Sequence, residues 1–467
     1  MNNSSGQSTL QLIGPLLIIL ILILTFAFFM PRVSAGKTIV AVAAGMILFM
    51  VGFASSQITL YILIFSMLLG PEIVVGTTAG ASLGRGVTLR LDDFLLVIIG
   101  FSWLARMALY KELGLFLKTP LNKPIAFYII ASLISTLIGA LMGRLDLKTG
   151  FLFVVKYFEY TVIYFMVVNH LHDKKQIRHF LWALLFTCVV VSFFGIAQIP
   201  GGGRVSAPFE GEVGEPNTFG GYLVLMMAIT IGLFLTTDSL RDRLIYGGII
   251  VIAFIPFLFT ESRSSYLAFF PMLLAFVWLS EKRKPIIVSL LFLVLLLPLV
   301  APHVVKDRVA YTFTQRLHPG QHVHIGSVRL DTSTSARLLS WGDALEDYVS
   351  HPIFGFGVTG YGFVDAQFPR MLVETGMVGM VSFIFLLWAI FTQGKSVFRE
   401  TTDIFHRGVS MGFLAGFIGL LVHAIGANTF IIVRIMEPFW FVLGMVVMIP
   451  EVDSKSSFEE LTVEGHL

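Results

Sequence analysis

The chain alternates long apolar runs with short polar stretches. The runs fall near residues 12–30, 38–54, 57–70, 91–109, 124–141, 151–169, 179–199, 217–236, 244–260, 264–280, 286–302, 371–392, 408–426 and 429–450. Most have the roughly 20 residues that a helix needs to cross a hydrocarbon core of about 30 Å. A transmembrane β-barrel would show alternating residues instead of solid runs. The pattern predicts an all-α polytopic transmembrane helical bundle of about 12–14 spans.

Composition supports the same class. Of the 467 residues 56% are hydrophobic and only 13% are charged, and a soluble domain of this length could not bury so much apolar surface. The net charge of +3 gives no indication of a nucleic-acid partner. The single cysteine, Cys188, lies in an apolar run, so no internal disulfide can form. Residues 1–11 carry no Lys or Arg, so we expect 12–30 to be a membrane anchor rather than a cleaved signal peptide.

Basic residues indicate how the spans are oriented. Five basic loops fall on one side under this span count, which marks that side as cytoplasmic: "YKELGLFLKTPLNK", "HDKKQIRH", "RDR", "EKRK" and "GKSVFRE". The loop "PRVSAGK" is an exception with two basic residues. The predicted organisation is an N-terminal transmembrane bundle (1–302), a large periplasmic loop (303–370), C-terminal transmembrane helices (371–450) and a cytoplasmic tail (451–467). A loop of this length is too long to be a simple connection, so we expect it to be folded.

Four arginines are expected on the external side, although basic residues are disfavoured there. They are Arg204, Arg263, Arg337 and Arg370. Arg263 lies in "FLFTESRSSYLAFF", where an arginine left deep in the bilayer would cost about 2.5–3.5 kcal/mol on insertion scales. Guanidinium groups bind phosphate through paired hydrogen bonds and stay charged, so such a cluster suits a phosphate or pyrophosphate. The alternative is that each arginine caps a loop, reaches lipid headgroups or pairs with an acid.

Four segments resemble the bacterial O-antigen polymerase and ligase superfamily. "TESRSSYLAFF" resembles its Ser-Arg signature, and "GRVSAPFEGEVGEPNTFGGYLVL" resembles its arginine loop. "SARLLSWGDALEDYVSHPIFGFGVTGYGF" resembles its large external loop, and "LVETGMVGMVSFIFLLW" resembles its Glu-x-Gly segment. The matching positions are Arg204, Pro216, Asn217, Ser262, Arg263, Arg337, Trp341, His351, Pro352, Gly355, Gly357, Glu374 and Gly376. The resemblance covers roughly residues 190–395.

The resemblance implies a membrane glycosyltransferase. It would polymerise, or ligate, glycan from an undecaprenyl-pyrophosphate-linked donor onto an acceptor glycan at the outer face of the bacterial inner membrane. Implied partners are the donor, the acceptor, the bilayer, a chain-length regulator and a flippase, with no nucleic acid and no metal or other cofactor. We expect Asp365 and Arg263 to be catalytic groups, with Arg204, Arg337, Lys156, Glu374, Asn217 and Ser262 as substrate-binding groups.

Asp365 marks a departure from the family pattern. Ligases of the family carry a histidine about nine residues before Glu-x-Gly, and Asp365 stands there. This favours a polysaccharide polymerase over a ligase that transfers glycan to lipid A core. A carboxylate can accept a proton from a sugar hydroxyl. The alternative is that Asp365 caps a helix beginning near Phe368, with Glu374 as the next candidate base.

Charged pairs inside two spans have a structural alternative. Lys156 and Glu159, like Arg434 and Glu437, are three residues apart and share a helix face. Intramembrane charges mark a substrate pathway or pair with each other. A proton-coupled or lipid-oligosaccharide transporter, or a structural export subunit, would also be compatible with such pairs. The chain shows no internal repeat, which argues against a transporter.

Three further motifs receive ordinary structural interpretations. "GFGVTG" follows no predicted strand, so we expect a turn rather than a dinucleotide site. His318, His322 and His324 lie on no evident helix, and we expect no metal site there. Asp307 and Asp331 are expected to be solvated.

Overall fold

The structure is a computed structural model that describes residues 35–70, 72–74, 88–110, 117–209, 214–281, 283–300, 303–314, 323–325 and 328–464. The predicted span 12–30 lies outside the described residues, as do His318 and His322. Every predicted run from 38–54 onward falls on a helix.

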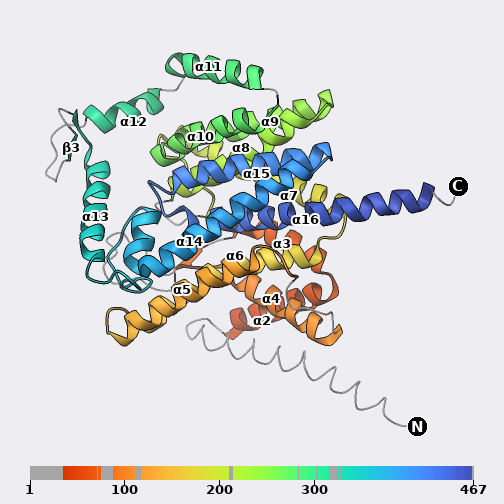
Figure 1. Ribbon diagram of the computed structural model, residues 1–467, viewed down its shortest axis with the longest axis horizontal. Coiled ribbons are helices and arrows are strands. Elements are labelled where there is room, and N and C mark those ends of the chain that lie inside the picture. Colours follow the sequence, from red (N-terminus) through yellow and green to blue (C-terminus); the bar gives the residue numbers. More distant parts are fainter. Residues whose placement is uncertain are drawn as a thin grey trace, which may run out of the picture.

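The apolar helices are labelled in chain order in Figure 1. They are α2 (Ala35–Ala54), α3 (Ser56–Leu69), α4 (Leu91–Tyr110), α5 (Asn122–Leu141), α6 (Leu147–His170), α7 (Lys174–Gln198), α8 (Pro216–Thr236), α9 (Leu240–Phe259), α10 (Arg263–Leu279), α11 (Arg283–Val300), α14 (Gln367–Glu400), α15 (Ile404–His423) and α16 (Val433–Glu464). Eight helices of the described part are long and apolar enough to cross a membrane. The protein is an all-α, multi-pass membrane protein, as the sequence predicts.

Short elements connect these helices. They are α12 (His303–Thr314), α13 (Thr332–Tyr348), the 3-10 turns η1 (Ile199–Gly201) and η2 (Thr429–Ile431), and the strands β1 (Glu72–Val74), β2 (Thr88–Arg90), β3 (His324–Ile325) and β4 (Val328–Arg329). The strands form two antiparallel hairpins, with Glu72 opposite Arg90 and His324 opposite Arg329.

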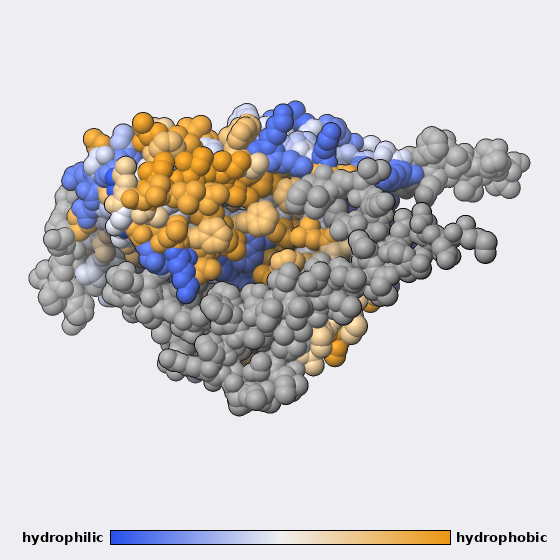
Figure 2. All heavy atoms as spheres, turned by 90° about the horizontal axis from the view of Figure 1, so that it is seen from below, coloured by the Kyte–Doolittle hydropathy of each residue, from blue (hydrophilic) through white to orange (hydrophobic). Residues whose placement is uncertain are grey.

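The bundle is built around α8, α15 and α16. α8 and α15 approach closely at glycines, because a Cβ added to Gly232 would lie 2.3 Å from the carbonyl oxygen of Gly408. Phe413 and Phe417 of α15 pack against Phe439 of α16, with ring centroids 5.2 and 5.8 Å away. Figure 2 shows that orange, hydrophobic side chains cover much of the described part of one outer face, with blue side chains at its edges and in smaller patches among them, as expected for a surface that mainly faces lipid.

The segment between α11 and α14 is folded, as the sequence predicts. A small second core is formed by Ala344 of α13, Val364 of the following loop and Val373 of α14. Trp341 and Phe356 pack against it. α14 begins at Gln367, and α16 continues to Glu464.

The molecule has two distinct ends (Figure 1). The links 199–209, 260–262 and 424–432 lie at the same end as α12 and α13, which we call the arginine end. The links 171–173, 237–239 and 401–403 lie at the opposite end, where α16 also terminates. The long loop and the C-terminus therefore lie at opposite ends of the bundle. Which end faces the cytoplasm stays a prediction.

Candidate functional site

The turn between α9 and α10 places Arg263 at the arginine end. Glu261 adopts a left-handed backbone conformation with φ 49°, which stops α9. Ser262 then caps α10, accepting a hydrogen bond from the Ser265 amide at 3.3 Å. Serine is favoured at this position because its hydroxyl satisfies an amide that the helix leaves unpaired. Arg263 is therefore the first residue of α10.

Arg204 docks the preceding loop onto this turn. Its Nε donates to the carbonyl oxygen of Thr260 at 3.0 Å, and its Nη2 donates to that of Glu261 at 3.3 Å. The Val205 amide adds a bond of 2.9 Å to the carbonyl oxygen of Phe259. Partial burial, followed by the nearby positive charge of Arg308, lowers the pKa of Arg204. The two arginines predicted to bind phosphate thus flank one turn.

Arg263 is held by α13. Its Nη1 donates to Asp331 Oδ2 at 2.8 Å and to Thr334 Oγ1 at 3.1 Å. Asp331 also caps α13, accepting from the Thr334 amide at 3.1 Å. The expectation that Asp331 is solvated was wrong, because its side chain is only 1% exposed. Desolvation opposes its charge, but the hydrogen bonds from Thr334 and Arg263 outweigh it and keep its pKa below the ordinary value.

Arg337 and Asp365 form a second, more open ion pair. The Nε and Nη2 of Arg337 both donate to Asp365 Oδ2, at 3.1 and 2.8 Å, and the two side chains are 21% and 26% exposed. Thr334 and Arg337 are three residues apart, so the two ion pairs share one face of α13. The alternative role of Asp365 as a helix cap was wrong. The N-cap of α14 is Ala366, and no side chain caps it.

Asn217 and Ser262 are brought together beneath the arginines. Ser262 Oγ donates to Asn217 Oδ1 at 2.7 Å and accepts from Ser265 Oγ at 2.7 Å. Ser265 Oγ also lies 3.1 Å from Nε2 of His423, whose Nδ1 is 2.8 Å from Thr429 Oγ1. Ser262, Ser265 and His423 are buried, so this series of hydrogen bonds fixes the starts of α8 and α10.

Comparison with known families identifies this region. Residues 248–384 match the family model described as O-antigen ligase. The chain is similar to this family over those residues. The matched segment holds Arg263, Asp331, Arg337, Asp365 and Glu374, and the match supports the O-antigen ligase and polymerase superfamily. It also supports glycan transfer in a membrane as the general type of activity. No curated protein matches the chain significantly.

Arg370 and Glu374 lie near the end of the matched segment, on α14. Arg370 Nε donates to Glu374 Oε1 at 3.1 Å, and the two side chains are 12% and 3% exposed. The loop before α14 covers them, since the Gly357 amide donates to the carbonyl oxygen of Glu374 at 2.8 Å. Gly357 has φ +94°, a conformation that favours glycine, so "GFGVTG" is a turn as expected. Because the Glu374 side chain is buried, it is placed to stabilise the packing of this region rather than to contact substrate.

Lys156 lies inside the bundle in a group of three charges. It pairs with Glu159 at 3.1 Å, as predicted, and also with Asp93 of α4. The structure thus adds a second carboxylate from a different helix. This group lies on α6 and α4 rather than on the turn that carries Arg263, so it is not brought together with the arginines.

Arg434 is the largest fully buried side chain of the described part. Its terminal nitrogens donate to four backbone carbonyl oxygens, those of Leu68, Gly70, Pro208 and Phe209, at 2.7 to 3.3 Å. The sequence predicted only a pair with Glu437. Arg434 therefore fastens the loop that follows Arg204 to the end of α3.

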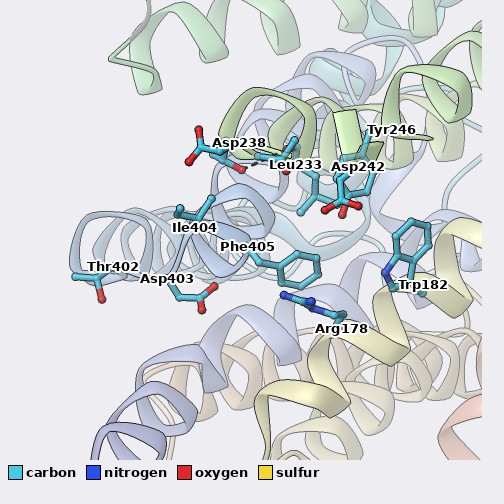
Figure 3. A pocket seen from close by; sticks show the side chains of 12 residues that line it. Arg178, Trp182, Leu233, Asp238, Asp242, Tyr246, Thr402, Asp403, Ile404 and Phe405 are labelled. Carbon is cyan, nitrogen blue, oxygen red and sulfur yellow. Dashed lines mark hydrogen bonds between the residues drawn. The ribbon is translucent and has the colours of Figure 1, made fainter. Parts of the chain in front are cut away.

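A cavity of about 510 Å³ lies at the opposite end of the molecule. Figure 3 shows Arg178, Trp182, Tyr246, Asp403 and Phe405 around it. The Arg178 guanidinium lies 4.9 Å from the Phe405 ring centroid, and Trp182 stacks on Tyr246 with centroids 5.7 Å apart. Arg178 lies near the start of α7 (Lys174–Gln198) and Arg204 follows the end of that helix, so this cavity is separate from the arginine site.

Sequence reasoning missed several residues of the site. Asp331 was dismissed as solvated, and His423 and Arg308 were not singled out. Arg308 could have been found, because it lies in the predicted external loop 303–370, on the same side of the membrane as Arg204. Nothing in the sequence around His423 distinguishes it from an ordinary helix-end histidine.

Proposed function

We propose that this protein is a polysaccharide polymerase that uses an undecaprenyl-pyrophosphate-linked glycan as donor. The supporting observation is that Arg263 and Arg204 flank one turn at the arginine end, and that Arg337 of α13, three residues after the Arg263 partner Thr334, holds the carboxylate of Asp365. In this proposal the arginine end faces the periplasm of a bacterial inner membrane. The five basic loops support that orientation.

An exposed stripe on α10 supports a lipid-linked donor. Leu267, Phe270, Leu274 and Trp278 follow Arg263 at helical spacing and are 56%, 37%, 56% and 48% exposed. A polyprenyl chain could lie along this stripe within the bilayer while its pyrophosphate reaches Arg263. The lipid tail would not need to leave the membrane.

The transfer step uses the fixed charges. The bond between the anomeric carbon of the donor and the pyrophosphate oxygen breaks, and its electron pair goes to that oxygen. A bond forms between the anomeric carbon and the acceptor hydroxyl oxygen, and the hydroxyl proton goes to Asp365. Arg204 and Arg263 stabilise the departing undecaprenyl pyrophosphate where its charge develops. The activated donor supplies the free energy.

Asp365 favours polymerisation over ligation in this scheme. It stands where family ligases have a histidine, and it is held by Arg337 through two hydrogen bonds. That contact keeps one carboxylate oxygen oriented, which a general base requires. Asn217 and Ser262 act on substrate only through the turn they brace, since Ser262 is buried.

The test is a reaction in detergent solution. Purified protein is mixed with a radiolabelled undecaprenyl-pyrophosphate oligosaccharide, and the products are separated by size. A polymerase converts donor into longer lipid-linked chains although no second compartment exists, and Arg263→Ala abolishes this conversion. A protein that leaves the donor unchanged in solution but moves it across proteoliposomes is a transporter, and that result would overturn the proposal.

A further inference from the structure

Arg308 brings a third guanidinium to the turn. It lies on α12, and its Nε donates to the carbonyl oxygen of Glu261 at 3.4 Å. Arg204 donates to the same carbonyl oxygen from the other side, at 3.3 Å. Two segments about a hundred residues apart in sequence thus place positive charges against one backbone oxygen.

The cluster carries more positive than negative charge. Arg204, Arg263 and Arg308 give three positive charges, whereas Glu261 and Asp331 give two negative charges, so the sum is +1. Asp331 is already bound to Arg263. Carbonyl oxygens accept hydrogen bonds but do not neutralise a guanidinium. Arg204 and Arg308 therefore repel each other, in keeping with the lowered pKa of Arg204.

An anion between these groups would relieve the repulsion. The contacts of Arg308 in the described part of the chain use Nε, which leaves its two terminal nitrogens with four N–H groups for an anion. α12 is joined to the bundle chiefly through α9 and β4, so Arg308 approaches the turn from outside the helix bundle. It is placed to contact the part of a ligand that lies farther from the membrane.

We propose that Arg308 binds the second phosphate of the donor and makes the site selective for lipid diphosphates over lipid monophosphates. This inference rests on the proposed function, since it assigns a residue to the same donor site. In this arrangement Arg263, at the head of the apolar stripe on α10, takes the phosphate next to the lipid. Arg204 and Arg308 take the phosphate next to the sugar, which gains charge when the glycan leaves.

Binding to purified full-length protein in detergent tests this assignment. The probes are farnesyl diphosphate and farnesyl monophosphate, measured by titration calorimetry. Arg308→Gln should weaken diphosphate binding by about 10- to 100-fold, the range for loss of a charged hydrogen-bond group, with less than about 3-fold effect on monophosphate. Arg308→Lys keeps the charge without the planar fork and should lose about 10-fold.

Lys306→Gln is the matched control. It removes the same charge two residues away on α12, where its side chain does not share the face of Arg308. Equal losses in Arg308→Gln and Lys306→Gln would show general electrostatic attraction and overturn the inference. So would equal weakening of both lipid phosphates in Arg308→Gln. Binding of neither probe by the wild-type protein would overturn the donor assignment itself, which distinguishes the two failures.

Discussion

The protein places charged side chains in two settings that differ in what surrounds them. At the arginine end Arg263 and Arg337 are 18% and 21% exposed, and each has a carboxylate from another segment. Inside the bundle Lys156 and Arg434 are enclosed by helices and by fixed carbonyl oxygens. A partly exposed guanidinium at the end of the bundle can share its hydrogen bonds with an arriving anion. An enclosed cation has only its built-in partners, so it specifies packing instead.

The difference shows how to separate function from stability in such a membrane protein. Replacing Arg337 should change turnover more than folding, because its partner Asp365 is 26% exposed and water can solvate the carboxylate left behind. Replacing an enclosed charge should change folding first, because its partner is left buried and unpaired. The following substitutions test this contrast.

Arg263 should give the largest effect. Arg263→Ala removes a cation fixed at the head of α10, and we expect glycan transfer to fall by at least about 100-fold, as for other fixed donors to a developing anion. Arg263→Lys should lose nearly as much, because lysine lacks the paired donors of the guanidinium. Arg241→Ala at the exposed start of α9, at the opposite end, is the control. Normal transfer by Arg263→Ala at unchanged protein abundance would contradict the assignment.

Replacing Asp365 should give the second-largest effect on glycan transfer. Asp365→Asn keeps an acceptor for Arg337 but cannot take a proton, so transfer should fall by about 100-fold or more while the unfolding temperature stays constant. Asp365→Ala should also fold, because Asp365 does not cap α14. Asp343→Asn, an exposed acid on α13, controls for the lost charge. If Asp365→Asn transfers glycan normally, another group is the base.

Replacing Lys156 should lower the stability of the protein more than it lowers glycan transfer per folded molecule. Lys156→Met leaves Asp93 and Glu159 buried without a cation, and breaking a buried pair costs about 3–5 kcal/mol. We expect low abundance and a lowered unfolding temperature in detergent, with partial recovery when Glu159→Gln is added. A stable Lys156→Met variant that has lost transfer would instead return Lys156 to the substrate site that the sequence suggested.

The sequence predicts the helices well and the partners of charged residues poorly. Apolar runs are local signals of bilayer length, so the helices from α2 onward match them. The partner of a charge depends on which distant segments meet. Asp93 joins Lys156 from another helix, and Asp331 reaches Arg263 across 68 residues of sequence. The arginines could be listed from the topology, but which carboxylate holds each of them could not.

The smallest effect on glycan transfer should come from Asp331, which both holds Arg263 and caps α13. Asp331→Asn still caps α13, because asparagine caps about as well as aspartate. Arg263 loses its charged partner but keeps its own charge and Thr334, so transfer should fall by about 10-fold or less.

The pH dependence of stability should also change when Asp331 is replaced. The pKa of Asp331 is lowered in the folded protein, so its ionised form stabilises the fold above its ordinary pKa of about 4. That contribution disappears as the pH falls through the lowered value. The unfolding temperature of the wild-type protein should therefore drop more steeply than that of Asp331→Asn between about pH 5 and pH 3. Parallel curves would mean that the contact between Asp331 and Arg263 does not stabilise the fold, and that Asp331 only positions the guanidinium.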